Sequence, residues 1–198
     1  YLQGILSFTE AEKYIKKFNN KIFVIKYGGS ALNDKYLANN FAKDLVLIKK
    51  LGINVVIVHG GGFQISETLK KKKLDSKFIN GLRVTDKKTI KIVKKVLIER
   101  INKKIVNLIN NAGGKAISLP GHKKNLIKVE PLKKEMGFVG KPKKIKIKII
   151  KNLIKKNYIP IIASLGFSGN KTFNINADTV AGELAASLSA TRFYFITN

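Results

Sequence analysis

The stretch Val55-Val56-Ile57-Val58-His59-Gly60-Gly61-Gly62 decides the fold of this chain. Its β-branched residues predict a buried strand, and three consecutive glycines end that strand before a helical pattern begins at Ile65. Glycine can adopt positive φ and lets the backbone approach a ligand, so the N–H groups of such a turn and of the next helix can converge on an anion. The same pattern is also typical of a simple tight turn, and the glycines alone leave that alternative open.

A second strand, upstream, also ends in glycines. Ile22 to Tyr27 has the apolar pattern of a buried strand, and Gly28-Gly29-Ser30 follows it. Lys26 lies two residues before the glycine pair, so its ammonium can reach a phosphoryl group that neighbouring backbone N–H groups also hold. Neither a Gly-x-x-x-x-Gly-Lys-Ser/Thr loop nor a Gly-x-Gly-x-x-Gly fingerprint is present in the sequence. The two turns therefore predict a phosphate site of another kind.

The segment between the two strands is predicted to be a helix. Leu37, Phe41, Leu45 and Ile48 recur with helical spacing, and Gly52 is predicted to end the helix. The order strand, helix, strand predicts a right-handed crossover between parallel strands. Both glycine turns then lie at the same edge of one sheet, where open α/β sheets bind ligands.

The rest of the chain continues this alternation. Thr9 and Glu12 form the pattern of a capping box, which predicts a helix to about Phe18, and Thr85 is predicted to cap a long helix that runs to Leu108. Further strands are predicted at 115–119, 158–164 and 192–197, an extended segment at 77–84, and a hairpin or small side sheet from 126–129 and 137–145. Further helices are predicted at 65–69 and 179–188. Residues 144–156 are predicted to form a strand followed by a helix, and residues 168–170 a hairpin turn. We therefore predict an α/β fold, a three-layer αβα sandwich with a mostly parallel central sheet.

Composition limits the classes of site and partner. The chain has 198 residues, of which 44% are hydrophobic, enough for one sizeable core. It contains no cysteine and only two histidines, His59 and His122, so we expect neither disulfides nor a zinc site, and no resident metal ion. No apolar run reaches the length of about 18 residues that a membrane-spanning helix needs, and we expect no membrane partner. We expect His59 to be a packed or hydrogen-bonded turn residue and not a catalyst.

The net charge of +27 raises the alternative of a nonenzymatic, basic nucleic-acid-binding module. Against it, the basic residues are almost all lysines spread along predicted solvent faces, without interleaved aromatic residues. An AT-rich coding sequence would also tend to enrich lysine, isoleucine and asparagine. We therefore expect that nucleic acid is not the partner.

Five short motifs in this chain resemble those of the amino acid kinase family, in that family's order and approximate spacing. They are Lys-Tyr-Gly-Gly-Ser at 26–30, Val-His-Gly-Gly-Gly at 58–62, Asn-Gly-Leu-Arg-Val-Thr-Asp at 80–86, Gly-Phe-Val-Gly at 137–140 and Asn-Ile-Asn-Ala-Asp at 174–178. One such motif would be a weak signal, whereas five in order are specific. The resemblance covers essentially the whole chain and implies that family's fold.

The resemblance implies roles for the residues around the first turn. Lys26 is expected to neutralise charge on the transferring phosphoryl group, and Gly28 and Gly29 are expected to donate N–H groups to phosphate oxygens. Asp178 is expected to orient the catalytic lysines and to form ion pairs with them. From the residues alone, Lys26 could instead be a strand-end lysine that reaches solvent, and Asp178 a helix N-terminal carboxylate.

The resemblance also implies how the acceptor is bound. Gly61 and Gly62 are expected to hold an acylated amino acid through their N–H groups, and Asn174 to hydrogen-bond it. Arg83 is expected to pair bidentately with a substrate carboxylate, which its planar fork does better than a lysine. A surface ion pair is the alternative role for Arg83.

The resemblance implies two parts of the chain and an incomplete domain. Residues 1–20 are expected to form an N-terminal helix, and residues 21–198 the N-terminal, acyl-amino-acid-binding part of an amino acid kinase domain. Family members continue well beyond this point, with a second catalytic lysine and most of the adenine site, and they carry Leu-Thr-Asp where this chain has Ile196-Thr197-Asn198. The chain also begins with Tyr1 and not with methionine. We therefore expect a C-terminally truncated fragment that is inactive alone.

The activity implied by the resemblance is ATP-dependent phosphorylation of the side-chain carboxylate of N-acetyl-L-glutamate in arginine biosynthesis. ATP is expected to arrive with Mg²⁺, without any tightly bound cofactor. Acetylaminoadipate, glutamate or carbamate remain alternative acceptors, although Arg83 and Asn174 favour a substrate with an α-carboxylate.

The expected assembly is a homo-oligomer, a dimer or a hexamer joined through the N-terminal helix. Arginine as a feedback inhibitor and a nitrogen-signalling regulatory protein are the further expected partners. The expected location is the cytoplasm, or the plastid stroma if the protein is organelle-encoded.

Overall fold

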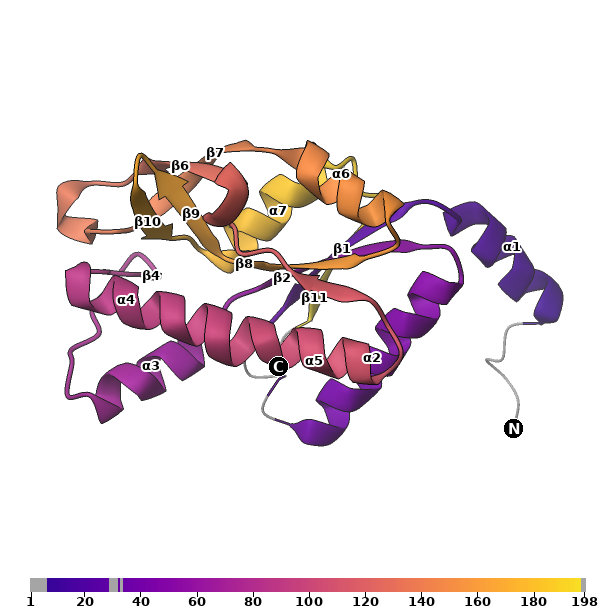
Figure 1. Ribbon diagram of the computed structural model, residues 1–198, viewed down its shortest axis with the longest axis horizontal. Helices are drawn as coiled ribbons and strands as arrows, with labels where there is room; N and C mark the ends of the chain where they lie inside the picture. The colour runs from indigo at the N-terminus through magenta and orange to yellow at the C-terminus, as the bar shows by residue number, and fades with distance from the viewer. Residues whose placement is uncertain (1–6, 29–31, 33, 197–198) are drawn as a thin grey trace.

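A parallel five-stranded sheet forms the centre of the computed structural model, which describes residues 7–28, 32 and 34–196 (Figure 1). Its strands are β1 (Ile22–Tyr27), β2 (Asn54–His59), β5 (Ala116–Ser118), β8 (Ile159–Ala163) and β11 (Arg192–Ile196). They lie in the order β11-β1-β2-β8-β5, and each neighbouring pair is parallel. The predicted parallel arrangement is confirmed, because β1 and β2 are parallel neighbours and α2 (Lys35–Lys50) joins them; the right hand of the crossover stays a prediction.

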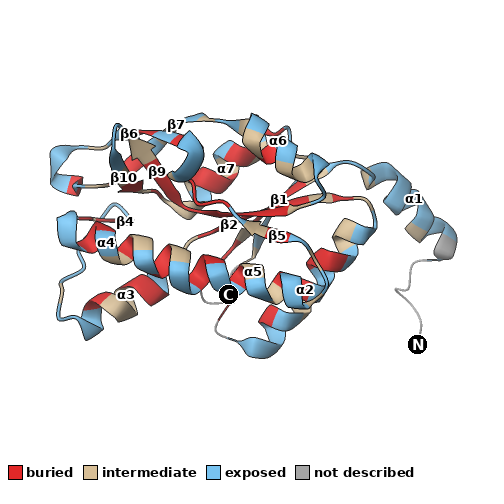
Figure 2. Ribbon diagram, in the orientation of Figure 1, coloured by how far each residue is buried: buried red, intermediate tan, exposed pale blue. Residues whose placement is uncertain are grey.

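Alternating side chains of the strands feed two separate cores. In β2, Val55 and Ile57 belong to one buried cluster, whereas Val56 and Val58 belong to the other. This alternation follows from the two-residue period of a strand, and both faces are apolar because helices cover both. The red interior of Figure 2 lies along the sheet and on the helix faces turned toward it.

Helices lie on both faces of the sheet, which confirms the predicted three-layer αβα sandwich. On one face lie α2 (Lys35–Lys50), α3 (Gly62–Lys71) and a continuous helix made of α4 (Lys87–Lys95), the π-helical η2 (Val96–Asn102) and α5 (Lys103–Asn111). On the other lie α6 (Ile147–Lys155) and α7 (Ala177–Ser187). No helix in the described part of the chain is both long and apolar enough to cross a bilayer.

A four-stranded side sheet lies beside the central sheet and contains the predicted hairpins. It has the order β10-β9-β6-β7. Its strands are β6 (Ile127–Pro131), β7 (Gly140–Ile145), β9 (Leu165–Ser168) and β10 (Lys171–Asn174), and two 3₁₀ turns, η3 (Lys123–Asn125) and η4 (Lys134–Met136), flank β6. A two-stranded hairpin of β3 (Phe78–Ile79) and β4 (Leu82–Arg83) precedes the long helix. The expected change from strand to helix within 144–156 is also confirmed, because β7 ends at Ile145 and α6 begins at Ile147.

The cap of the N-terminal helix differs from the prediction. Helix α1 (Phe8–Phe18) is capped by Ser7, whose hydroxyl accepts a hydrogen bond from the Glu10 N–H at 3.2 Å while the Glu10 carboxylate accepts the Ser7 N–H at 3.0 Å. The capping box is therefore two residues earlier than the predicted pair of Thr9 and Glu12. The sequence offers two serine or threonine candidates with glutamate three residues later, and the first of them begins the helix.

The predicted cap of the long helix is also wrong by one residue. Asp86 caps α4, because its carboxylate accepts the Thr89 N–H at 2.6 Å. Thr85 is fully buried, and its hydroxyl donates instead to the Arg83 carbonyl at 2.8 Å. Its own carbonyl accepts the Phe138 N–H at 2.6 Å, so Thr85 joins the hairpin to the side sheet.

Candidate active site

The two glycine turns meet at one edge of the central sheet, as predicted. Tyr27 and His59, the last residues of β1 and β2, are partners in the parallel register. A cavity of about 270 Å³ lies beyond them. Its lining includes Lys26, Gly28, Gly60, Gly61, Gly62, Phe78, Leu82, Arg83, Val139, Ser164, Asn174, Ile175, Asn176 and Asp178. All the predicted site residues except Gly29 therefore line one cavity, and Gly29 lies outside the described residues.

The three-glycine turn provides free backbone donors at the start of α3. Gly61 is the N-cap of α3 without any side-chain cap, and the N–H groups of Gly61 and Gly62 make no hydrogen bond with another described residue. The first turn of a helix leaves such donors pointing outward with the positive end of the helix dipole. The turn therefore presents donors of the kind that an anion accepts, and the predicted anion site at this turn stays a prediction.

The reason for glycine in this turn is steric, and the turn does not use the positive φ that glycine can adopt. Gly61 has φ 178°, and no residue of the turn is among the glycines with positive φ. A Cβ on Gly61 would lie 2.3 Å from the Ile101 Cδ1 and 2.9 Å from a Leu97 methyl group, both on η2. A Cβ on Gly62 would meet nothing within 4 Å. A Cβ on Gly60 would lie 3.0 Å from the Ala177 Cβ, a tight contact. Neighbouring side chains therefore restrict Gly61 most and Gly60 less, and they do not restrict Gly62.

His59 is buried and hydrogen-bonded, as predicted, although it is the last residue of β2 and not part of the turn. Its Nδ1 lies 3.1 Å from the Gly60 carbonyl oxygen and its Nε2 lies 2.9 Å from the Asn102 amide nitrogen. That amide nitrogen also donates to the Ile161 carbonyl at 2.9 Å, which fixes its orientation. The ring therefore donates from Nδ1 and accepts at Nε2. Burial lowers the pKa of His59 to about 4, so the ring is neutral near pH 7.

Arg83 is buried in the cavity wall and has no carboxylate partner among the described residues. Its Nη2 donates to the Gly62 carbonyl at 3.0 Å and the Ser66 hydroxyl at 2.8 Å, and its Nη1 contacts the Ser76 hydroxyl. The guanidinium also stacks over the Phe78 ring at 4.6 Å. Burial lowers its pKa, although arginine remains charged. A surface ion pair is therefore not its role in the described structure.

Lys26 and Asp178 form an ion pair across the cavity. The Lys26 Nζ lies 3.0 Å from Asp178 Oδ1, and the lysine side chain is only 15% exposed. Asp178 lies in the first turn of α7, where the helix dipole also stabilises a carboxylate. The expected pairing of these two residues is thus present, and the low exposure of Lys26 excludes a lysine that merely reaches solvent.

The Gly28 N–H is already engaged. It donates to the Ile196 carbonyl at 2.8 Å, extending the ladder between β1 and β11. Gly28 lines the cavity and leaves room there because it has no side chain. To donate to a phosphate oxygen, its N–H would have to exchange this partner.

Polar side chains from the side sheet and from α7 close the cavity. Asn174 bonds through its backbone to the Phe138 carbonyl at 2.9 Å, and its Nδ2 lies 3.3 Å from the Thr85 hydroxyl. Asn176, which the sequence analysis did not select, caps α7 by accepting the Thr179 N–H at 2.9 Å. Its position in the motif Asn-Ile-Asn-Ala-Asp, two residues from Asn174, was the signal that could have identified it.

The described residues contain no group of three or more histidine, cysteine or acidic side chains that could hold a metal ion. Asp178 is the one carboxylate in the lining of the cavity given above. The donor set of cations and backbone N–H groups suits anionic ligands.

Comparison with known proteins identifies similar sequences and structures. The model of the amino acid kinase family matches residues 21–198. An acetylglutamate kinase from Caldanaerobacter subterraneus subsp. tengcongensis is 48% identical over 193 residues, which cover 96% of this chain and 64% of that protein. The crystal structure of smu.665 from Streptococcus mutans UA159 has a TM-score of 0.84 at 34% identity and covers 89% of this chain and 72% of that chain.

A more distant structure shares the fold. N-acetylglutamate synthase from Neisseria gonorrhoeae, solved with coenzyme A and N-acetyl-glutamate, has a TM-score of 0.85 at 23% identity and covers 96% of this chain and 44% of that chain. The present chain therefore spans 64% of the length of the kinase from Caldanaerobacter and a smaller share of the synthase.

Proposed function

Since the chain belongs to the amino acid kinase family, we propose that the protein transfers the γ-phosphoryl group of ATP to the side-chain carboxylate of N-acetyl-L-glutamate. A carboxylate oxygen attacks the γ-phosphorus, the bond from that phosphorus to the β,γ-bridging oxygen breaks, and ADP leaves. The product is N-acetyl-L-glutamyl 5-phosphate, an intermediate for arginine synthesis. The printed name of the similar kinase supports this acceptor.

The observation that carries the proposal is the buried Arg83, which has no carboxylate partner within residues 7–28, 32 and 34–196. A guanidinium at 6% exposure is costly unless a counter-charge reaches it, and its neighbours Ser66 and Gly62 are neutral acceptors. An α-carboxylate in the cavity would supply that charge. Asn174, the last residue of β10, also lines the cavity and would hydrogen-bond the same ligand.

Two further groups would act on the reacting atoms. The free N–H groups of Gly61 and Gly62 would hold oxygen atoms of the acceptor or of the transferred group. Lys26 would balance negative charge that moves onto the phosphoryl oxygens, while Asp178 keeps the ammonium oriented before ATP binds. Gly28 and Gly29 would complete the phosphate side of the site.

ATP would enter as its Mg²⁺ complex. Mg²⁺ in such complexes is held largely by phosphate oxygens and water, which fits a cavity whose described lining has one acidic residue, Asp178. Lys26 would then contact the phosphate groups. Asp178, which is paired with Lys26, would keep the lysine ammonium directed at those groups.

The test is a phosphorylation assay of the intact protein against a panel of acceptors: N-acetylglutamate, acetylaminoadipate, glutamate and carbamate. We expect the highest kcat/KM for N-acetylglutamate, and no activity toward any carboxylate would contradict the proposal. The alternative of a nucleic-acid-binding module, suggested by the net charge of +27, predicts tight and steeply salt-dependent binding to mixed-sequence DNA.

The assembly and regulation follow from the same family resemblance. We propose a homo-oligomer, a dimer or a hexamer, in which α1 contacts another subunit through Tyr14 and Ile15, which are 50% and 37% exposed. Arginine as an inhibitor and a nitrogen-signalling protein as a regulator are the proposed effectors. The proposed location is the cytoplasm, or the plastid stroma for an organelle-encoded protein.

A further inference from the structure

A peptide between two glycines has little to hold its orientation. Gly60 and Gly61 carry no side chains, so rotation of the peptide plane between them meets few steric barriers. In one orientation its N–H faces the cavity, whereas in the reverse orientation its carbonyl oxygen does. A carbonyl oxygen there would repel an anionic ligand, so the turn can bind anions only if this peptide is held.

The buried His59 ring holds it. No described peptide bond is cis, and in a trans peptide the carbonyl and the N–H point in opposite directions. The Gly60 carbonyl is turned toward the fully buried His59 Nδ1, at 3.1 Å. The N–H of the same peptide, that of Gly61, is therefore turned away from the buried ring, toward the cavity that Gly60 and Gly61 line. It makes no hydrogen bond with a described residue.

Asn102 fixes which His59 nitrogen carries the proton. Its amide nitrogen donates to the His59 Nε2 and to the Ile161 carbonyl, both at 2.9 Å. Because Nε2 accepts, the single proton of the neutral ring must lie on Nδ1, where the Gly60 carbonyl needs a donor. Asn102 is itself fully buried at the end of the π-helical η2, the helical form often found near functional sites.

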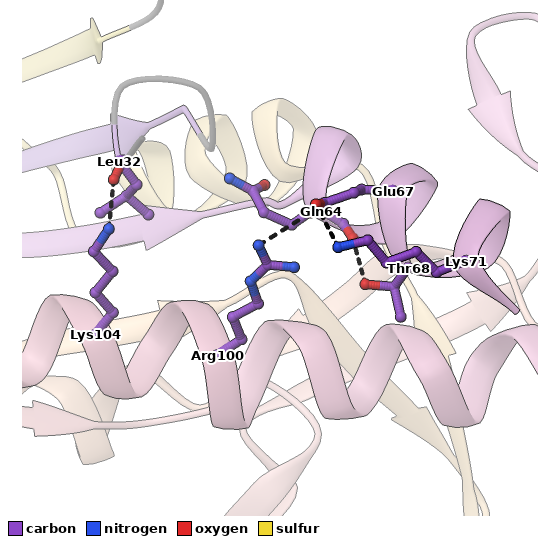
Figure 3. A network of polar contacts seen from close by, with 7 residues as sticks. All are labelled: Leu32, Gln64, Glu67, Thr68, Lys71, Arg100 and Lys104. Atoms are coloured by element: carbon purple, nitrogen blue, oxygen red, sulfur yellow. Dashed lines mark hydrogen bonds and ion pairs between the residues drawn. The ribbon is translucent and has the colours of Figure 1, made fainter. Parts of the chain in front are cut away.

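The helix that carries Asn102 also contacts the segments that follow the two turns through its charged residues. Arg100 pairs with Glu67 of α3 at 3.0 Å, and the Lys104 ammonium donates to the Leu32 carbonyl, in the segment after β1, at 2.6 Å (Figure 3). Together with Leu97 and Ile101 against Gly61, these contacts fix η2 relative to the site. Asn102 is therefore a rigidly placed donor.

We propose that His59 and Asn102 are positioning residues, which hold the Gly60–Gly61 peptide so that the Gly61 N–H donates to an anionic group of the bound substrates. This rests on the proposed function for the identity of those substrates. Neither side chain touches substrate or reacting atoms. Their effect is to exclude the reversed peptide, in which the Gly60 carbonyl faces the cavity.

The decisive experiment compares two replacements of His59 in the intact protein. The amide nitrogen of an asparagine can occupy the place of Nδ1 and still donate to the Gly60 carbonyl, whereas a glutamine amide reaches the place of Nε2 and does not. We expect kcat/KM for N-acetylglutamate to be about tenfold or more higher in His59→Asn than in His59→Gln. Complete loss of one backbone donor to the transition state costs about 10²- to 10³-fold, and misorienting the Gly61 N–H should cost part of that. If His59 had a purely structural role, His59→Asn would not be more active than His59→Gln. Equal kcat/KM values for the two variants would overturn the proposal.

A second pair tests Asn102 with a matched control. Asn102→Leu removes the donor to His59 and should lower kcat/KM. Asn110→Leu makes the same change on α5, at a side chain whose hydrogen bonds in the described structure go to the backbone of Ala116. Unfolding by urea, measured for both, separates loss of stability from loss of activity. A folded Asn102→Leu variant with the kinetics of Asn110→Leu would contradict the role of Asn102.

A binding measurement keeps the inference independent of the kinase assignment. In ¹⁵N NMR titrations with inorganic phosphate, we expect the Gly61 amide to shift in the wild type and in His59→Asn, and to shift much less in His59→Gln. The wild-type ring should show a protonated Nδ1 and an unprotonated Nε2. If the phosphorylation assay shows no activity but the Gly61 amide and the His59 ring behave as expected, the proposed function fails and the positioning role stands. A Gly61 amide that does not respond in the wild type, or a proton on Nε2, rejects the positioning role.

Discussion

A buried guanidinium that lacks a carboxylate partner in the described structure gains most from a bound anion. We therefore expect Arg83→Ala to raise KM for N-acetylglutamate far more than KM for ATP. The expected loss is about 2–3 kcal/mol in kcat/KM, the scale of a hydrogen bond to a charged group. Steady-state kinetics with each substrate varied in turn measure both effects.

Arg83 also holds Ser66 and the Gly62 carbonyl, so its removal can disturb α3. Arg83→Lys keeps a cation but not the planar fork, and should show the same selective rise in KM. Arg192→Ala, at an exposed arginine of β11, is the matched control and should leave both KM values unchanged. Equal effects of Arg83→Ala on the two substrates would mean that Arg83 does not bind the acceptor.

The ammonium of Lys26 is expected to matter most after the substrates are bound. Lys26→Met should lower kcat by about 10²–10³-fold, the scale of losing one electrostatic contact to the transition state, with modest changes in either KM. Lys21→Met, one residue before the same strand and exposed, is the control. A Lys26→Met enzyme with nearly wild-type kcat would remove this residue from the mechanism.

At the residue scale, the motifs predicted side chains that the structure brings to one cavity, but not their hydrogen bonds. Lys26, Arg83, Asn174 and Asp178 are distant in sequence and line one cavity. The bond of the Gly28 N–H to Ile196 depends on which strand lies beside β1, and no local pattern contains that information. Their roles in catalysis and binding remain predictions.

The glycine turn and η2 act as one packed unit at the scale of elements. Gly61→Ala would place a methyl group against Ile101 and Leu97, so we expect it to destabilise the fold by about 1–3 kcal/mol, as overpacking does. Gly62→Ala meets open space and should change stability by about 0.5 kcal/mol or less. Urea unfolding of the two variants measures the difference, and a Gly61→Ala protein as stable as Gly62→Ala would show that η2 does not restrict the turn.

At the element scale, periodicity located the helices and strands, and errors fell at their ends and within the long helix. Ser7 and Asp86 replace the predicted caps because neighbouring residues of similar chemistry compete for each helix start. The π-helical η2 has the side-chain pattern of an ordinary helix, so only its packing against Gly61 and His59 distinguishes it. The sequence predicted the layers and parallel crossover because these follow from the strand, helix, strand order.

The stability of the whole molecule should depend on pH through His59. Its pKa is lowered from 6.5 to about 4, so the unfolded chain takes up a proton as the pH falls below about 6.5, and the folded protein does so only near 4. Stability is therefore fully present above pH 6.5 and is lost as the pH falls toward 4. The expected loss from this group is on the order of 2 kcal/mol between pH 7.5 and 5.

Urea unfolding at several pH values, compared between the wild type and His59→Asn, isolates this contribution. The wild type should lose more stability than the variant over the same interval. Burial and the nearby Lys94 and Lys123 lower the pKa of His122 to about 4 as well, so His122→Asn is the control for the second histidine. Identical pH profiles for the wild type and His59→Asn would show that His59 is not buried as a neutral ring.

The exposed apolar face of α1 should determine the assembly of the intact protein. Replacing Tyr14 and Ile15 together by serine should leave dimers and weaken inhibition by arginine, because both side chains are exposed and are expected to pack on another subunit. Phe18 stays in place to pack on Phe23 of the same chain. Sedimentation measures the change, with Lys13→Ser and Lys16→Ser as a control on the same helix. Unchanged hexamers would reject the role of α1.

The position of β11 beside β1 has a consequence for the order of folding. Nearly the whole described chain separates these two neighbours, whereas β1 and β2 are joined by a single helix. Local contacts form early because they close short loops, so β1, α2 and β2 can assemble before β11 has left the ribosome. The Gly28 N–H meets the Ile196 carbonyl only when β11 docks. The phosphate side of the cavity is therefore completed after β1, α2 and β2 have assembled, and until β11 docks the chain exposes the edge of β1 to pairing with other chains.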